Sequence, residues 1–211
     1  MFRDTVGIGV TDPTVPDRDL FPEEAHAIRS AVEKRKREFA AGRVAARAAM
    51  ERIGAEPHPI PMADDRSPHW PVGLIGSITH CDDMCLAAVA QSTNVRAIGI
   101  DIEPNTPLDD DLLVTVCQTE ERDWLSRQPA GQRGKLAKVI FSAKESAYKA
   151  QYPLSKTLFG YEGLSVTPNL SAGRFTARFR VDAPPFRTGG EITGSIALTN
   201  GYILTSAIIP L

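Results

Sequence analysis

The first strong periodic pattern in the chain lies at residues 22–52 and is that of a helix. Pro22, Glu23 and Glu24 form a favourable first turn, because proline fits near N1 and acids stabilise the positive end of the helix dipole. Gly54 follows as a stop signal. Apolar residues recur at the helical period: Ile28, Val32, Phe39, Ala46 and Met50. The pattern predicts one long helix that turns this stripe toward the core.

Three short strand candidates follow, at residues 73–78, 85–90 and 96–103. In the third, isoleucines alternate with polar or small residues, as in a strand with one buried face. The isoleucines are Ile98, Ile100 and Ile102, and the alternating residues are Gly99, Asp101 and Glu103. The stretch 104–111 is rich in proline and acids and is interpreted as a connector.

The second half of the chain repeats this order of helices followed by strands. A short helix at 119–127 leads to a longer one at 133–151, which Pro153 is expected to end. Alternating patterns at 174–181, 192–198 and 202–209 predict strands. Asn200-Gly201, between the last two, is a strong hairpin signal.

The repeated order of elements predicts an α+β fold with two similar subdomains about a pseudo-twofold axis, although no sequence identity links the halves. We expect an N-terminal half at 1–104, with the basic helix and the third strand, and a C-terminal half at 105–211. The cleft between the halves is the expected place for the active site.

Composition narrows the class of protein. The chain has 211 residues and a formal net charge of −2, so no excess of positive charge points to nucleic acid or a membrane as partner. The first residues lack the layout of a signal peptide, and no apolar run reaches the ~20 residues that span a bilayer. Three cysteines without a zinc spacing are interpreted as reduced thiols, which favours the cytoplasm.

Two carboxylates stand on one face of the third strand, because residues i and i+2 of a strand point the same way. Asp101 and Glu103 would repel each other unless a cation lies between them. A Mg²⁺ ion with one or two carboxylates, waters and a substrate phosphate fits this pattern. The alternative is a solvated strand edge whose acids face water.

A second candidate lies on the long helix of the second half. Glu145 and Lys149 are four residues apart and share a helix face. An ordinary surface ion pair is the alternative interpretation. In the functional interpretation, Glu145 completes a metal site or acts as general base, and Lys149 neutralises a phosphate.

Two further groups suit a phosphate. Ser77, Thr79 and His80 end a strand with hydroxyl groups and a titratable ring; the alternative is a capped strand end with a buried histidine. In the basic run from Lys34, Arg35 falls near the centre of the apolar stripe and needs an anionic partner. For Arg35 and Arg43, phosphate binding competes with solvation.

Taken together, these pieces resemble one family. GSITHC, IGIDIEP and FSAKESAYKA, in that order and with RKREFAAGRVAAR and HWPVG upstream, resemble the signature blocks of the 4′-phosphopantetheinyl transferases. The distance between the second and third blocks is that of the longer, two-halved Sfp-type branch, with the character of its actinobacterial members. The resemblance covers residues 22–161.

The resemblance implies a role for each matching position. Asp101, Glu103 and Glu145 match the metal cluster for Mg²⁺, with Mn²⁺ possible, and Glu145 is also a candidate base, directly or through a water. Lys149 and Lys144 match contacts to the phosphates. The family positions that contact the nucleotide end of coenzyme A are matched by Arg35, Arg43, Ser77, Thr79 and His80, and more weakly by Arg66. One of the two adjacent glutamates, Glu120 or Glu121, also has a counterpart in the family, and the sequence leaves open which of the two it is.

The implied activity is that of a holo-[acyl-carrier-protein] synthase. Such an enzyme moves the phosphopantetheine arm of coenzyme A to a serine of a carrier protein of polyketide, nonribosomal peptide, siderophore or fatty-acid synthesis, and releases 3′,5′-ADP. The resemblance also implies a monomer. The alternatives are a metal-dependent hydrolase of coenzyme A and a non-catalytic module that binds coenzyme A or a carrier.

Overall fold

A computed structural model describes residues 5–16 and 19–211. Contacts between residues divide the chain into two compact units. The N-terminal unit extends to residue 98 and also includes residues 210–211, and the C-terminal unit comprises residues 99–209. Both contain helices and antiparallel strands, which confirms the α+β class. The predicted boundary at 104/105 and the pseudo-twofold axis stay predictions; the units divide inside a strand.

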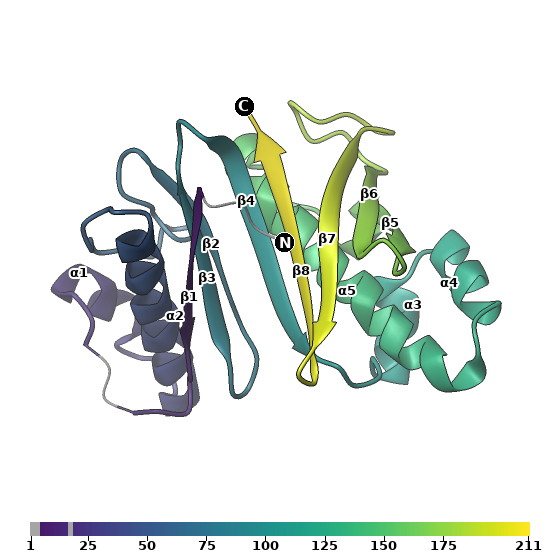
Figure 1. The fold of residues 1–211 in the computed structure, drawn as a ribbon, viewed down its shortest axis with the longest axis horizontal. Helices are drawn as coiled ribbons and strands as arrows, with labels where there is room; N and C mark the ends of the chain where they lie inside the picture. The colour runs from purple at the N-terminus through teal and green to yellow at the C-terminus, as the bar shows by residue number, and fades with distance from the viewer. Residues whose placement is uncertain (1–4, 17–18) are drawn as a thin grey trace. The chain divides into compact units, whose positions relative to one another are not determined.

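The N-terminal unit is a three-stranded antiparallel sheet packed against one long helix (Figure 1). The strands lie in the order β1-β3-β2: β1 (Val6–Thr11), β3 (Cys85–Gln91) and β2 (Leu74–His80). The helices are α1 (Pro22–Ala25), the 3-10 turn η1 (His26–Ile28) and α2 (Glu33–Arg52).

The contact between β1 and α2 depends on small residues. A Cβ atom at Gly7 would lie 2.0 Å from the carbonyl oxygen of Ala49, and one at Gly9 would lie 1.8 Å from that of Ala45. The helix therefore rests on the strand backbone. The sequence analysis missed β1, because its alternate positions are glycines, which have low strand propensity.

The single helix predicted at 22–52 is wrong in its first part. The chain leaves the helix after η1, and Val32 caps α2 in an extended conformation (φ −66°, ψ 153°). A tertiary contact accounts for the break, because Glu24 turns back to pair with Arg47 on α2 at 2.9 Å. The predicted end near Arg52, with Gly54 at φ +73°, is confirmed.

The C-terminal unit is built on a five-stranded sheet in the order β4-β8-β7-β6-β5, with a long helix, α5, against it (Figure 1). The strands are β4 (Val95–Pro104), which begins in the other unit, β5 (Leu164–Asn169), β6 (Arg174–Phe179), β7 (Glu191–Thr199) and β8 (Tyr202–Pro210). The helices are α3 (Asp110–Val116), α4 (Thr119–Ser126), α5 (Arg133–Ser155) and the 3-10 turns η2 (Ala130–Gln132) and η3 (Tyr161–Gly163).

Local signals in this unit were mostly correct. The hairpin at Asn200-Gly201 is confirmed, with φ of 50° and 83°. Pro153 does not end α5: it lies inside the last turns, and the helix stops at Lys156 in the left-handed conformation. A proline so near the C-terminus removes only one hydrogen bond. Helix α3 occupies the end of the predicted connector and continues beyond it.

No helix in the described part of the chain combines the length and the apolar character needed to span a membrane.

Candidate active site

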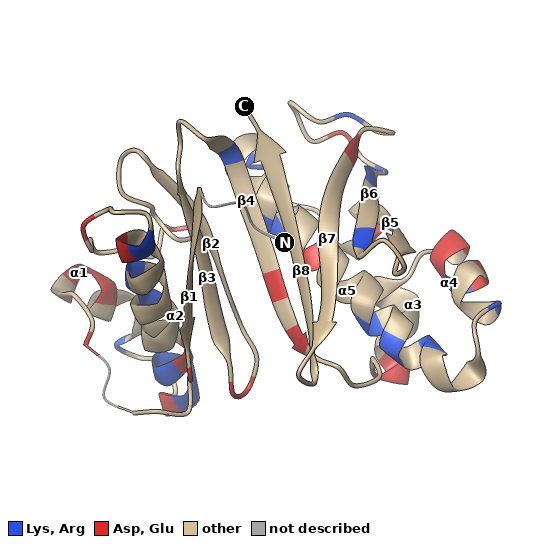
Figure 2. Ribbon diagram, in the orientation of Figure 1, with Lys and Arg blue, Asp and Glu red and all other residues tan. Residues whose placement is uncertain are grey.

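The two acidic motifs of the sequence analysis meet where α5 crosses β4. A Cβ atom at Gly99 would lie 1.9 Å from the carbonyl oxygen of Ser146, so only glycine allows this approach. Lys149 Nζ then reaches β4, where it donates to the carbonyl oxygen of Ile100 at 3.2 Å and to Oδ1 of Asp101 at 2.7 Å. Asp101 is buried. Figure 2 shows the acidic residues toward the C-terminal end of β4.

Glu103, the second acid of β4, has a separate cation. Its Oε2 atom lies 3.2 Å from Nζ of Lys138, which α5 contributes, and both side chains are largely buried. Burial raises the pKa of Glu103, the nearby charge of Asp101 raises it further, and Lys138 opposes both. The site thus holds carboxylates that repel each other and are compensated by lysines.

Glu145 accepts a hydrogen bond from the hydroxyl of Tyr161 at 2.9 Å. The pKa of this tyrosine is raised by its burial first, and then by the negative charges of Glu145, Asp101 and Glu103. The hydroxyl therefore stays protonated and remains a donor. Because all three acids act on one hydroxyl, the predicted metal ligands share one neighbourhood.

In the N-terminal unit, Arg35 and His80 lie side by side. Nη1 of Arg35 is 3.3 Å from Nε2 of His80, and Glu38 Oε2 lies 3.7 Å from each. The side chain of Arg35 is half exposed, so it is not buried in the apolar stripe. Glu38 was missed by the sequence analysis, although its place three residues after Arg35 was a usable signal.

Arg43 is buried and held in one orientation. Its Nε donates to the carbonyl oxygen of Ile60 at 2.9 Å, and its guanidinium lies over the Phe39 ring, 3.8 Å from the centroid. Burial lowers the pKa of Arg43 to about 10. Ser77 and Thr79 are buried on β2, whereas Arg66 lies exposed in a turn at φ 65°.

Comparison with known proteins gives one consistent result. Residues 97–205 match the model of the 4′-phosphopantetheinyl transferase superfamily, and residues 23–90 match that of the 4′-phosphopantetheinyl transferase N-terminal domain. The chain belongs to this superfamily. It is therefore a transferase of the holo-[acyl-carrier-protein] synthase type, as the signature blocks predicted.

Individual transferases are similar over most of the chain. The 4′-phosphopantetheinyl transferase Svp of Streptomyces mobaraensis is 43% identical over 205 residues, which cover 93% of this chain and 81% of the relative. PptT of Mycobacterium tuberculosis is 34% identical over 209 residues, covering 94% and 89%. Enterobactin synthase component D of Salmonella typhimurium is 40% identical over 143 residues, covering 66% and 58%.

The sequence analysis expects a divalent metal, and the donor set fits one in its chemistry. Asp101, Glu103 and Glu145 offer only carboxylate oxygens, the ligands that Mg²⁺ prefers. Their partners in the structure are Lys149, Lys138 and Tyr161. Within residues 5–16 and 19–211, no group of three acidic, histidine or cysteine side chains is arranged to hold an ion.

For Lys144, the second lysine predicted to contact phosphates in the transferase, the structure gives other partners. The side chain is only 2% exposed, and Nζ donates to Val116 O at 2.7 Å, Glu121 Oε2 at 2.8 Å and Tyr161 O at 3.1 Å. All three N–H bonds are engaged, so a contact with phosphate would require one of them to break. Of the two adjacent glutamates, Glu121 is the buried one, while Glu120 is half exposed and pairs with Arg180.

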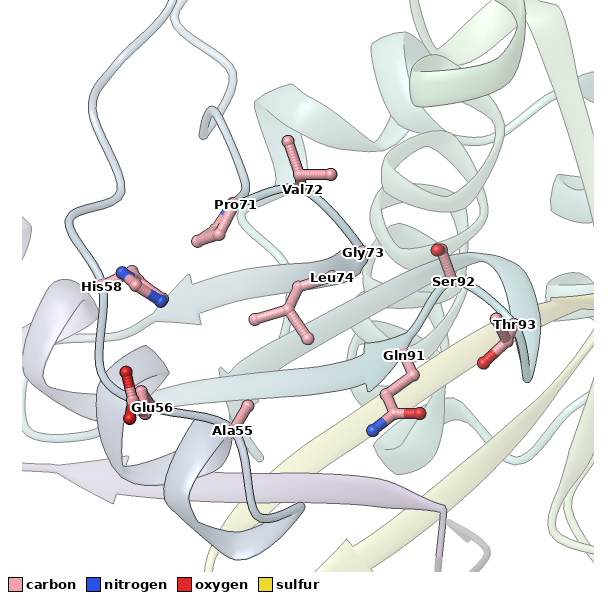
Figure 3. A pocket seen from close by; sticks show the side chains of 10 residues that line it. All are labelled: Ala55, Glu56, His58, Pro71, Val72, Gly73, Leu74, Gln91, Ser92 and Thr93. Carbon is pink, nitrogen blue, oxygen red and sulfur yellow. The ribbon is translucent and has the colours of Figure 1, made fainter.

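A pocket of about 360 Å³ in the N-terminal unit contains none of the predicted site residues (Figure 3). It is lined by the loop after α2, the start of β2 and the end of β3, with Leu74 and Gln91 among its residues. His80 stands at the other end of β2. The predicted nucleotide contacts therefore do not depend on this pocket.

Proposed function

We propose that the chain transfers the 4′-phosphopantetheine group of coenzyme A to a serine hydroxyl of an acyl or peptidyl carrier domain and releases 3′,5′-ADP. The contact of α5 with β4 through Gly99 carries this proposal, because it brings Asp101 and Lys149 within 2.7 Å of each other. Three acids and two lysines in one partly buried cluster suit a reaction that builds negative charge on phosphate.

The chemical step follows from these groups. The serine oxygen attacks the phosphorus that carries the pantetheine arm, and the bond from this phosphorus to the oxygen of 3′,5′-ADP breaks. Glu145 accepts the serine proton, directly or through a water. Lys149 neutralises charge on the phosphates.

Asp101, Glu103 and Glu145 would hold Mg²⁺ or Mn²⁺. When bound, the ion supplies Lewis-acid stabilisation of the charge on the diphosphate. Lys149, whose Nζ lies 2.7 Å from Asp101, would present its ammonium group to the phosphates beside these carboxylates. The raised pKa of Glu103 supports this role, because crowded carboxylates gain most from an added cation.

The N-terminal unit would bind the nucleotide end of coenzyme A. Arg35 and His80 form a half-exposed basic pair suited to the 3′-phosphate, and buried Arg43 adds a fixed guanidinium. Ser77, Thr79 and Arg66 complete the proposed contacts. We assign no phosphate contact to Lys144.

The carrier substrates are proposed from the relatives. Similarity to the enterobactin synthase component D proteins supports a carrier of siderophore synthesis. The resemblance of the signature blocks to the family extends the proposal to carriers of polyketide, nonribosomal peptide and fatty-acid synthases. The described cysteines are free thiols, in keeping with action in the cytoplasm. A monomer remains the expected state.

Intact-mass spectrometry of an apo carrier protein, incubated with the chain, coenzyme A and Mg²⁺, tests the proposal. We expect a gain of about 340 Da, the mass of the phosphopantetheine group, that EDTA abolishes. Consumption of coenzyme A without a gain in mass would instead identify a hydrolase. Binding of coenzyme A without turnover on several carriers would identify a binding module.

A further inference from the structure

Tyr161, which the sequence analysis did not select, connects the proposed catalytic carboxylate to a buried ion pair. It begins η3, between α5 and β5. Its hydroxyl donates to Oε1 of Glu145 at 2.9 Å, and its carbonyl oxygen accepts from Nζ of Lys144 at 3.1 Å. Two adjacent residues of α5 thus hold the same tyrosine at its two ends.

The ion pair that Tyr161 contacts, between Lys144 and Glu121, is buried and hydrogen-bonded on both sides. Nζ of Lys144 lies 2.8 Å from Oε2 of Glu121, and the two side chains are 2% and 1% exposed. The other oxygen of Glu121 accepts from the backbone N–H of Val166 at 2.6 Å, and Lys144 also donates to Val116. Movement of either charge would leave the other buried and unpaired, which is strongly unfavourable.

The ring of Tyr161 is fixed as well. It packs on Phe141 of α5, with centroids 5.6 Å apart, and Gln118 donates to its carbonyl oxygen at 3.3 Å. The hydroxyl therefore approaches Glu145 from one direction. It engages Oε1, so Oε2 can face a proton or a metal ion.

We propose that Tyr161 is a positioning residue, whose hydroxyl orients the Glu145 carboxylate and whose own place is set by the buried pair of Lys144 and Glu121. The inference rests on the proposed function, because it assumes that Glu145 acts in the reaction. The terminal torsion of a glutamate is soft. Without the hydrogen bond, the carboxylate would sample several orientations, and a group that must be aligned would act less often.

Tyr161→Phe tests the inference, because it removes the hydroxyl and keeps the ring on Phe141. Outer partners of a catalytic or metal-binding group typically contribute about 10- to 100-fold. We expect kcat to fall by about 10- to 100-fold, with KM for coenzyme A within about twofold of wild type. Binding of Mn²⁺ to the protein without coenzyme A, followed by electron paramagnetic resonance, should weaken by about tenfold.

Two further variants separate this inference from the function on which it rests. Tyr202→Phe, which removes a hydroxyl at the β7–β8 hairpin, should retain wild-type kcat and Mn²⁺ affinity. Glu145→Gln should lose most activity, and adding Tyr161→Phe to it should cause little further loss, because the two groups act as one.

The outcomes are distinct. If Glu145→Gln is inactive while Tyr161→Phe keeps wild-type kcat and Mn²⁺ affinity, the positioning role is wrong and the proposed function stands. Fully additive losses in the double variant would also overturn positioning. Wild-type turnover by Glu145→Gln would remove the role of Glu145 itself, and the inference with it.

Discussion

The two units share a local scaffold, and among the residues that the structure describes only the C-terminal unit carries the acidic cluster of Asp101, Glu103 and Glu145. In each, the first strand lies under the long helix at a glycine. A Cβ atom at Gly7 would lie 2.0 Å from the carbonyl oxygen of Ala49, and one at Gly99 would lie 1.9 Å from that of Ser146. The same close approach of strand and helix is therefore built twice in the chain.

A buried glutamate repeats as well. Glu24 and Glu121 are each the third residue of a short helix and each accept from the backbone N–H of the capping residue. Each pairs with a cation 23 residues later on the long helix, Arg47 or Lys144. Each also accepts from a backbone N–H beyond that helix, at Ile60 and Val166.

Aligned on these pairs, the units differ where the chemistry is proposed. Glu145 follows Lys144, whereas Ala48 follows Arg47, and Arg52 stands in the place of Lys149. On the first strand, Gly9 and Thr11 stand in the places of Asp101 and Glu103. The N-terminal unit forms this contact of strand and helix without the acids, so the contact as such does not depend on them, which supports a functional reason for their presence.

The largest effect is expected from the acids themselves. Asp101→Asn or Glu145→Gln should lower kcat for transfer to a carrier protein by about 10³-fold or more, because metal binding and proton acceptance are lost together. Circular dichroism should show an unchanged fold. Substantial turnover by either variant would contradict the assigned roles.

The buried pairs should have similar effects on stability and different effects on catalysis. Glu24→Gln and Glu121→Gln each remove the counter-charge of a cation with little exposure, Arg47 at 14% and Lys144 at 2%. Each variant should therefore lower the free energy of unfolding by about 3–5 kcal/mol in urea titrations. Only Glu121→Gln should also lower kcat at a temperature where both variants are folded. Equal effects on kcat would show that the two units do not differ as proposed.

Lys149 and Arg52 form a matched pair on the two long helices. Lys149→Ala should lower kcat by about 100-fold, because one preorganised charge at the phosphates is removed. Arg52, exposed at the end of α2, is the control, and Arg52→Ala should stay within about twofold of wild type. A large loss in the control would place the phosphates elsewhere.

Arg43 should act on binding more than on chemistry. Arg43→Ala should weaken coenzyme A binding by about tenfold in calorimetry, since one charge-assisted contact is worth about 1.5–3 kcal/mol. At saturating coenzyme A, kcat should change little. Arg37→Ala, on the same helix, is the control, and equal affinities for the two variants would remove Arg43 from the nucleotide site.

The smallest effects concern the buried thiols, one in each unit. Burial raises the pKa of Cys117 to about 12, so very little thiolate is present at pH 8. We expect Ellman's reagent to modify Cys81 first, and Cys85 and Cys117 only after unfolding. The rate at Cys81 should rise with pH, because its pKa is also raised by burial. Equal rates at all three thiols would contradict the burial.

Elements governed by local chemistry were predictable. The Asn200-Gly201 turn follows from the conformations that these residues tolerate, and β4 follows from its alternating isoleucines. Elements that depend on contacts with residues far away in the sequence were not predictable. Strand β1 depends on the helix that covers its glycines, and the break before α2 depends on the pairing of Glu24 with Arg47.

The candidate site divides in the same way. The sequence placed Asp101 with Glu103, and Glu145 with Lys149, because strand and helix periods are local. It could not place one pair beside the other, since that contact depends on the absence of a side chain at Gly99. Nor could the sequence distinguish the surroundings of Lys144 from those of Lys149. Helix α5 directs Lys144 into the interior, toward Glu121, and Lys149 toward Asp101 on β4.

The sequence by itself determined the class of fold, most of the helices and strands, the family and the kinds of residue that carry charge, because these depend on composition, period and spacing. Only the tertiary structure decided which charges are partners. Burial gives Glu24 and Glu121 a structural role as partners of buried hydrogen bonds and ion pairs. The close approach of α5 to β4 brings the acids of the candidate site together. The physical reason is that desolvation and distance set the energy of a charge, and both arise only when segments far apart in the chain meet.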